Sequence, residues 1–299
     1  MTYYPSIAGL ELGGTKCIAI LGTGPDDIRA RETVPTTDPA TTLAALERIL
    51  DSWRFDALGI ATFGPLDLDP RSSDYGSITA TPKPGWTGTD LTRRFAARYG
   101  VPLAIQTDVV GAALAEQRWG AARGLSSHCY ITVGTGVGVG LISGNLPVQG
   151  VAHGEAGHMR VRRSPGDDFG GSCPFHGDCI EGLISGPALA KRFGRPASEL
   201  PDGGTEWDLF VHDLAGLLHN LAVTAAPERI AIGGGVLTSR EGLFPKLRAA
   251  LAASIAAYGS LALYAEQLDS RLGPPGLGAM AGPLGALAVG LGVLNKAEG

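Results

Sequence analysis

One local pattern occurs twice in this chain and constrains its fold more than any other feature. Residues 7–21, IAGLELGGTKCIAIL, form an apolar run, a glycine turn and a second apolar run, and residues 128–142, HCYITVGTGVGVGLI, repeat that plan. Each segment predicts a β-hairpin, and the repetition indicates two related halves. A third apolar run ends in a glycine turn at residues 229–236, RIAIGGGV.

The segments between these turns alternate between strand and helix patterns, which indicates an α/β architecture. We expect strands over 55–63 and 101–107, and helices over 41–53, 89–99, 109–119, 181–194 and 206–226, with one more helix ending at Tyr258. The polar stretch 67–88 is too long for a plain turn, and loops of that length are usually functional or disordered. Its residues Tyr75, Lys83 and Trp86 favour function.

Composition excludes several classes of protein. The chain of 299 residues is 44% hydrophobic and 18% charged, which argues against disorder. Its net charge of −5 disfavours a nucleic-acid binder, for which a basic patch is expected. It lacks both a window of roughly 18 uninterrupted apolar residues and the basic and apolar regions of a signal peptide. We therefore expect a cytoplasmic protein that neither spans a membrane nor binds nucleic acid.

The first glycine turn combines Gly13, Gly14, Thr15 and Lys16, and Glu11 precedes it. A glycine pair lets the backbone approach an anionic group closely, and Lys16 adds a positive charge. Glu11 offers a carboxylate suited to Mg²⁺ or to a metal-bound water. An ordinary Gly-Gly hairpin turn accounts for the same residues, so both interpretations stay open.

The second and third glycine turns extend this pattern. Around Gly134, Thr135 and Gly136, β-branched valines favour a hairpin over a helix start, so a Rossmann-type nicotinamide site is not expected. Two facing hairpins would offer two sets of backbone N–H groups to one polyphosphate. The third turn, Gly233–Gly235, could lie against a nucleotide base. Together the three turns predict a nucleotide site.

A Cys-x₂-His-x₂-Cys motif is the sharpest chemical signal. Cys173, His176 and Cys179, with His158 upstream, supply two thiolates and two imidazoles, enough for a closed tetrahedral zinc site of structural type. The competing interpretation is a chance cluster of buried cysteines. His153 and His212 are alternative ligands, and we expect Asp178 to face solvent. Cys17 and Cys129, in apolar strands, are expected to be buried thiols.

Three carboxylates outside the first turn are candidates for chemistry. Asp108 follows a predicted buried strand and could be a general base for a hydroxyl group, or it could cap the next helix. Glu155 and Glu181 flank the Cys/His motif and could accept hydrogen bonds from a polyol. Alternatively, Glu155 is a solvent-facing carboxylate in a loop and Glu181 an ordinary Glu at a helix start.

Taken in order, these segments resemble the ROK family of sugar kinases. The resemblance extends from ELGGTK to GALAVGL, and GEAGH with CPFHGDCIEG resembles the family signature and its cysteine-rich zinc loop. ELGGTK, ATFGPLDL, YGSITATPKPGW, QTDVVGAALAE and CPFHGDC are similar to the bacterial fructokinase branch. The resemblance implies the actin-like (RNase H-like) ATPase fold, with two α/β domains and an interdomain cleft. Residues 1–107 plus 285–299 would be a small domain closed by the C-terminal helix, and 108–284 a larger domain with the zinc loop.

The resemblance also implies a role for each candidate residue. Asp108 would be the catalytic base, and Glu155, His158 and Glu181 would hold sugar hydroxyls. Zinc would be bound by His158, Cys173, His176 and Cys179. ATP would contact Gly13, Gly14, Thr15, Lys16, Gly134, Thr135, Gly136, Pro187, Gly233, Gly234, Gly235 and Val236.

We therefore expect a homodimeric kinase that uses ATP and Mg²⁺ to convert D-fructose to D-fructose 6-phosphate. The alternatives are a glucokinase, mannokinase or N-acetylmannosamine kinase, a non-catalytic sugar-sensing module, or a purely structural zinc protein. Two departures from the family pattern stand out, Glu11 where many members have Asp, and Val110 where Asn is usual. Because ELGGTK begins at residue 11, we expect no helix-turn-helix ahead of it.

Overall fold

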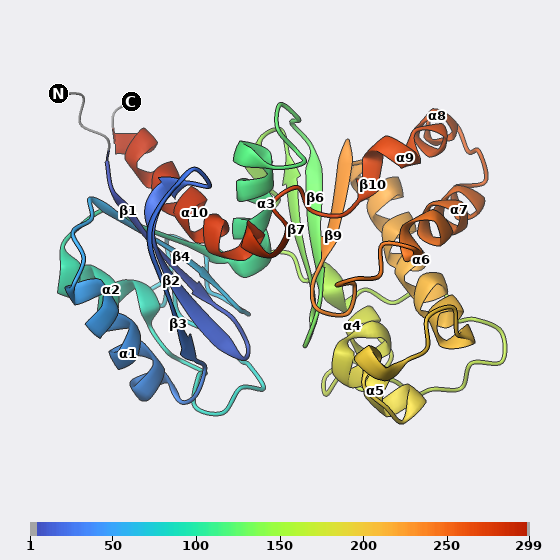
Figure 1. Ribbon diagram of the computed structural model, residues 1–299, viewed down its shortest axis with the longest axis horizontal. Coiled ribbons are helices and arrows are strands. Elements are labelled where there is room, and N and C mark those ends of the chain that lie inside the picture. Colours follow the sequence, from blue (N-terminus) through green and yellow to red (C-terminus); the bar gives the residue numbers. More distant parts are fainter. Residues whose placement is uncertain (1–4, 298–299) are drawn as a thin grey trace. The chain divides into compact units, whose positions relative to one another are not determined.

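The computed structural model describes the backbone of residues 5–297 and the side chains of residues 5–294. The chain divides into two compact units. The first contains residues up to Arg123, the segment Pro147–Gly154 and residues from Ala279 onward; the second contains Gly124–Leu146 and Glu155–Gly278. Figure 1 shows the elements of both units. Among the described residues, none of the helices combines the length and apolar character needed to cross a membrane.

The first unit is built on a five-stranded sheet of order β3-β2-β1-β4-β5. β1 pairs with β2 in the predicted antiparallel hairpin and with β4 in parallel, and β4 pairs in parallel with β5. The strands are β1 (Ile7–Leu12), β2 (Lys16–Gly24), β3 (Asp27–Pro35), β4 (Ala57–Thr62) and β5 (Leu103–Thr107). The helices are α1 (Pro39–Asp51), α2 (Leu91–Tyr99), α3 (Asp108–Trp119) and α10 (Ala281–Ala297).

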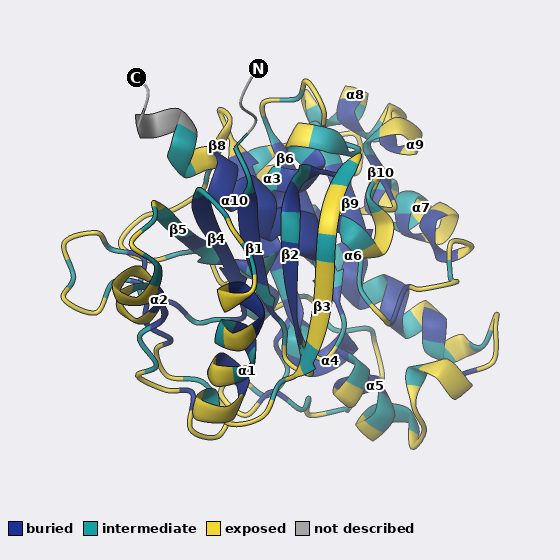
Figure 2. Ribbon diagram, turned by 60° about the vertical axis from the view of Figure 1, so that its left-hand side comes forward, coloured by how far each residue is buried: buried dark blue, intermediate teal, exposed yellow. Residues whose placement is uncertain are grey.

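Strand alternation divides the two faces of this sheet. On β1, Ala8, Leu10 and Leu12 join the buried core formed with α1 and α2, whereas Gly9 lies against α10 on the other face. Glu11 shares the α10 face because side chains two residues apart point the same way. Figure 2 shows the buried strands β1, β2 and β4 beside the largely exposed β3.

The second unit repeats this plan with the sheet order β10-β9-β6-β7-β8. β6 pairs with β7 in the second predicted hairpin and with β9 in parallel. The strands are β6 (His128–Val133), β7 (Val137–Ser143), β8 (Leu146–Pro147), β9 (Arg229–Gly233) and β10 (Leu272–Gly273). The helices are α4 (Ile180–Ile184), α5 (Gly186–Phe193), α6 (Thr205–Ala225), α7 (Leu243–Ile255), α8 (Leu261–Glu266) and α9 (Leu268–Arg271), with short 3₁₀ turns η1 (Ala156–His158) and η2 (Ala197–Glu199). A third 3₁₀ turn, η3 (Gly278–Met280), begins at the last residue of this unit and ends in the first unit.

The two units differ from the expected domains mainly because α3 belongs to the first unit. We assigned residues from 108 onward to the second domain, but α3 lies in the first unit because it packs against α10 and β4. The C-terminal helix α10 covers β1 and β4 of the first sheet. The α/β architecture and the paired hairpins agree with the sequence analysis.

Candidate active site

The first glycine turn connects β1 to β2 and is held by the backbone. The Gly13 N–H donates to the Lys16 carbonyl oxygen at 3.0 Å, and the Thr36 hydroxyl donates to the Gly13 carbonyl oxygen at 2.7 Å. Gly14, Thr15 and Lys16 are exposed. The turn therefore presents a hydroxyl group and an ammonium group on a fixed backbone, as a phosphate site requires.

Lys83 also reaches this turn; the sequence favoured a function for its loop but gave Lys83 no specific role. Its Nζ donates to the Gly14 carbonyl oxygen at 3.3 Å and lies 4.8 Å from the centre of the Phe63 ring. The unusual TPKPGW segment was the only sequence signal. A second positive charge thus lies beside the first glycine turn.

Two carboxylates lie near one another in the first unit. Burial, reinforced by the negative charge of Asp108, raises the pKa of Glu11 to about 7, against the opposing influence of Lys16 and Arg31. Among the described residues, the buried Oε2 of Glu11 has no hydrogen-bond partner. A buried carboxylate oxygen without a partner, beside a second carboxylate, is a hard-oxygen donor set that fits Mg²⁺ or its bound water.

Asp108 begins α3, directly after β5, but another residue caps the helix. The hydroxyl of Thr107 accepts from the Val110 N–H at 3.3 Å, which makes Thr107 the N-cap. Asp108 accepts from the Val109 N–H at 2.9 Å and remains half-buried. The capping interpretation of Asp108 was wrong, because Thr107 already performs that role. The side chain of Val110 is buried.

The second and third glycine turns lie side by side in the second unit. The Val236 N–H donates to the Val133 carbonyl oxygen at 3.0 Å, and Gly234, with φ of 98°, lies against the backbone of Val133. Thr135 and Gly235 are exposed, and so is Pro187 at the start of α5. Val236 is buried and its N–H is engaged.

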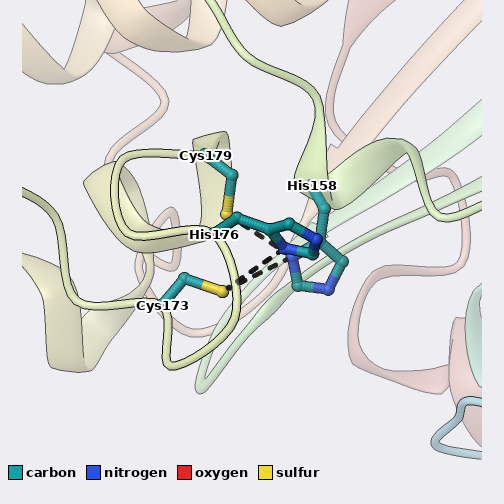
Figure 3. Close-up of side chains that lie close together, drawn as sticks. All are labelled: His158, Cys173, His176 and Cys179. Atoms are coloured by element: carbon teal, nitrogen blue, oxygen red, sulfur yellow. Dashed lines mark hydrogen bonds between the residues drawn. The ribbon is translucent and has the colours of Figure 1, made fainter.

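The four predicted zinc ligands come together in the second unit, as Figure 3 shows. Nδ1 of His158 lies 3.4 Å from Sγ of Cys179 and 3.7 Å from Sγ of Cys173, and Nδ1 of His176 lies 3.7 Å from Sγ of Cys173. All four ligand atoms lie within 4.8 Å of one another. Tetrahedral zinc, with bonds of about 2.0–2.3 Å, separates its ligands by roughly 3.3–3.8 Å. The donor set and these three separations therefore fit zinc.

The alternative ligands are engaged elsewhere. Nε2 of His153 accepts from the Leu66 N–H at 2.9 Å, and His212 bonds to the Arg162 carbonyl oxygen at 2.9 Å. Asp178, expected to face solvent, forms an ion pair with Arg160 at 2.8 Å.

Glu155 and Glu181, the two carboxylates that flank this cluster, have different environments. Glu155 is exposed, and its Oε2 lies 4.0 Å from Nε2 of His158, whose other ring nitrogen faces the cysteines. The imidazole of His158 can therefore hold a metal on one side and a polar group on the other. Glu181 instead directs Oε2 to the Val137 N–H at 3.1 Å, a contact that the sequence did not reveal.

Comparison with known proteins shows the family and the fold. A sequence model of the ROK family matches residues 7–291. The chain is 41% identical to the fructokinase of Zymomonas mobilis over 96% of this chain and 97% of that protein. It is 38% identical to the fructokinase of Pediococcus pentosaceus over 97% of this chain and 99% of that protein. The ROK hexokinase structure from Thermus thermophilus, 27% identical, superimposes with a TM-score of 0.75 over 98% of this chain and 100% of that one. The expected two-domain sugar-kinase fold is confirmed.

Proposed function

The chain belongs to the ROK family, and we propose that it is a fructokinase, which transfers the γ-phosphoryl group of ATP to D-fructose to give D-fructose 6-phosphate. The observation that carries this proposal is the placement of Asp108. It is the first residue of α3 and lies near Glu11, and the N-cap of this helix is Thr107. The fructokinases that match nearly the full chain support fructose as the sugar.

Asp108 is the general base in this proposal. Its carboxylate takes the proton from the sugar hydroxyl as that oxygen attacks the γ-phosphorus, and the bond to the β–γ bridging oxygen of ATP breaks. Phosphoryl transfer depends mainly on positioning and on neutralising charge. Glu11 would hold Mg²⁺ or its bound water, and the cation would neutralise phosphate charge.

The glycine turns bind the nucleotide in this proposal. Gly13, Gly14, Thr15 and Lys16 form one phosphate site, and Gly134, Thr135 and Gly136 form the other. Pro187 and Gly233–Gly235 contact the adenosine. The resemblance also implies that Val236 contacts ATP. Because its side chain is buried, Val236 in this proposal supports the third glycine turn from the core.

The sugar is held by Glu155, His158 and Glu181 in this proposal, and zinc orders the segment that carries them. His158, Cys173, His176 and Cys179 would hold the zinc, with all four positions filled by protein. Such a closed site stabilises structure and leaves no position for an activated water. Zinc would thereby fix the ring of His158 with its Nε2 directed toward Glu155.

A coupled assay of ADP release with fructose, glucose, mannose and N-acetylmannosamine tests the proposed substrate. We expect the highest kcat/KM for fructose. A preference of tenfold or more for one of the other sugars would reassign the enzyme to that activity within the family, and no turnover with any sugar would favour a sensing module. We further propose a homodimer, on the resemblance alone, which analytical ultracentrifugation can check, and a cytoplasmic location, on the sequence, which cell fractionation can check.

A further inference from the structure

The second glycine turn is supported by two short elements next to the Cys/His cluster: η1, which contains His158, and α4, which begins directly after Cys179. η1 places Gly157 against the carbonyl oxygen of Val137, the residue directly after the turn. The approach leaves no space for a Cβ atom at this position. His158, the next residue, is one of the four cluster ligands.

α4 supports the same turn from a second direction. Oε2 of Glu181 accepts from the Val137 N–H at 3.1 Å and would lie 2.6 Å from a Cβ at Gly136. Just beyond α4, the Gly186 N–H donates to the Gly134 carbonyl oxygen at 2.7 Å. Glu181 lies two residues after Cys179, another cluster ligand.

The two supporting elements are joined at the cluster. The Ile180 N–H donates to the Met159 carbonyl oxygen at 2.9 Å, and Nδ1 of His158 lies 3.4 Å from Sγ of Cys179. Figure 3 shows the side chains of His158 and Cys179 pointing toward one another. A metal bound to both ligands would fix η1 and α4 relative to one another, because metal–ligand bonds are short and directional.

We propose that metal occupancy of the Cys/His cluster controls nucleotide affinity, with Glu181 acting as a positioning residue that holds the second glycine turn. This inference rests on the proposed function, in which that turn binds ATP phosphates. It extends the role of the metal from ordering the sugar-binding residues to shaping the phosphate site.

The first test measures ADP binding, without sugar or turnover. Isothermal titration calorimetry compares the zinc-loaded protein with chelator-treated protein whose zinc content is measured and whose fold is checked by circular dichroism. We expect the dissociation constant for ADP to rise at least fivefold on zinc removal. A dissociation constant for ADP that does not change on zinc removal would overturn the inference. So would the finding that the purified protein contains no zinc. If the zinc-loaded protein itself fails to bind ADP, the proposed function is contradicted instead.

A pair of variants tests Glu181 with zinc bound and does not depend on the stability of metal-free protein. Glu181→Gln keeps an oxygen that can accept from the Val137 N–H, whereas Glu181→Met removes the acceptor. We expect ADP affinity within twofold of the parent for Glu181→Gln and about tenfold weaker for Glu181→Met. Glu266→Met, at an exposed position of α8, is the matched control. If both Glu181 variants lose fructose affinity and bind ADP normally, Glu181 acts on the sugar alone and the inference fails.

Discussion

Replacing Glu11 by Gln should stabilise the protein at alkaline pH while impairing its activity. Burial and the nearby charge of Asp108 raise the pKa of Glu11 to about 7, from an ordinary value of 4.5. Above pH 7 the folded protein therefore holds a carboxylate charge in unfavourable surroundings. A neutral amide removes that cost, but it cannot offer a charged oxygen to Mg²⁺, so turnover should fall by about 100-fold.

The size of the stability effect follows from the two pKa values. The folded state binds the Glu11 proton more tightly than the unfolded state, so lowering the pH favours folding. Between pH 8 and pH 5, the free energy of unfolding of the parent should rise by about 2.5 kcal/mol relative to the variant. The gain begins as pH falls through the folded pKa and is complete below 4.5, where both states are protonated.

Urea denaturation of both proteins at pH 8 and pH 5 measures this difference. Titration of the groups that do not interact with Glu11 is common to the two proteins and cancels. Glu32→Gln, on the exposed strand β3, is the matched control and should show no pH-dependent difference from the parent. The free energy of unfolding of the parent relative to Glu11→Gln should change between the two pH values. A change below about 0.5 kcal/mol would refute the argument that Glu11 is held in unfavourable surroundings.

Two further predictions concern the second unit. Elemental analysis should find about one zinc per chain, and Cys173→Ser should lose most of it; full zinc retention by this variant would show that the metal binds elsewhere. Arg192→Met should lower the free energy of unfolding by about 3 kcal/mol, since it leaves buried Asp213 and Asp167 without the guanidinium that pairs with both, at 2.8 and 2.5 Å. A loss below 1 kcal/mol in urea denaturation would contradict the importance of this buried network.

Local patterns predicted most of the fold. The β1–β2 and β6–β7 hairpins were predictable because apolar runs flank each glycine turn, and α1 and α2 because apolar residues recur at helical spacing. Strand β3 was missed. Most of its residues are exposed, so it has no apolar signature, and pairing with β2 determines its conformation.

The site was predictable where its residues lie close in sequence. The Cys/His cluster follows from ligand spacing, but the contact of Lys83 with Gly14 joins residues 69 positions apart and has no local signal. The sequence also left open whether Asp108 caps α3. Thr107 and Asp108 are both good caps, and only the backbone geometry at the end of β5 decides in favour of Thr107.

Turnover and sugar binding by Asp108→Asn test the central claim most directly. An amide preserves the shape of the side chain but cannot take a proton, so fructose-dependent ADP release should fall by about 10³-fold. Calorimetry should show fructose binding within a few-fold of the parent protein. Retention of a tenth of the turnover would contradict the role of Asp108 as the base that activates the sugar hydroxyl.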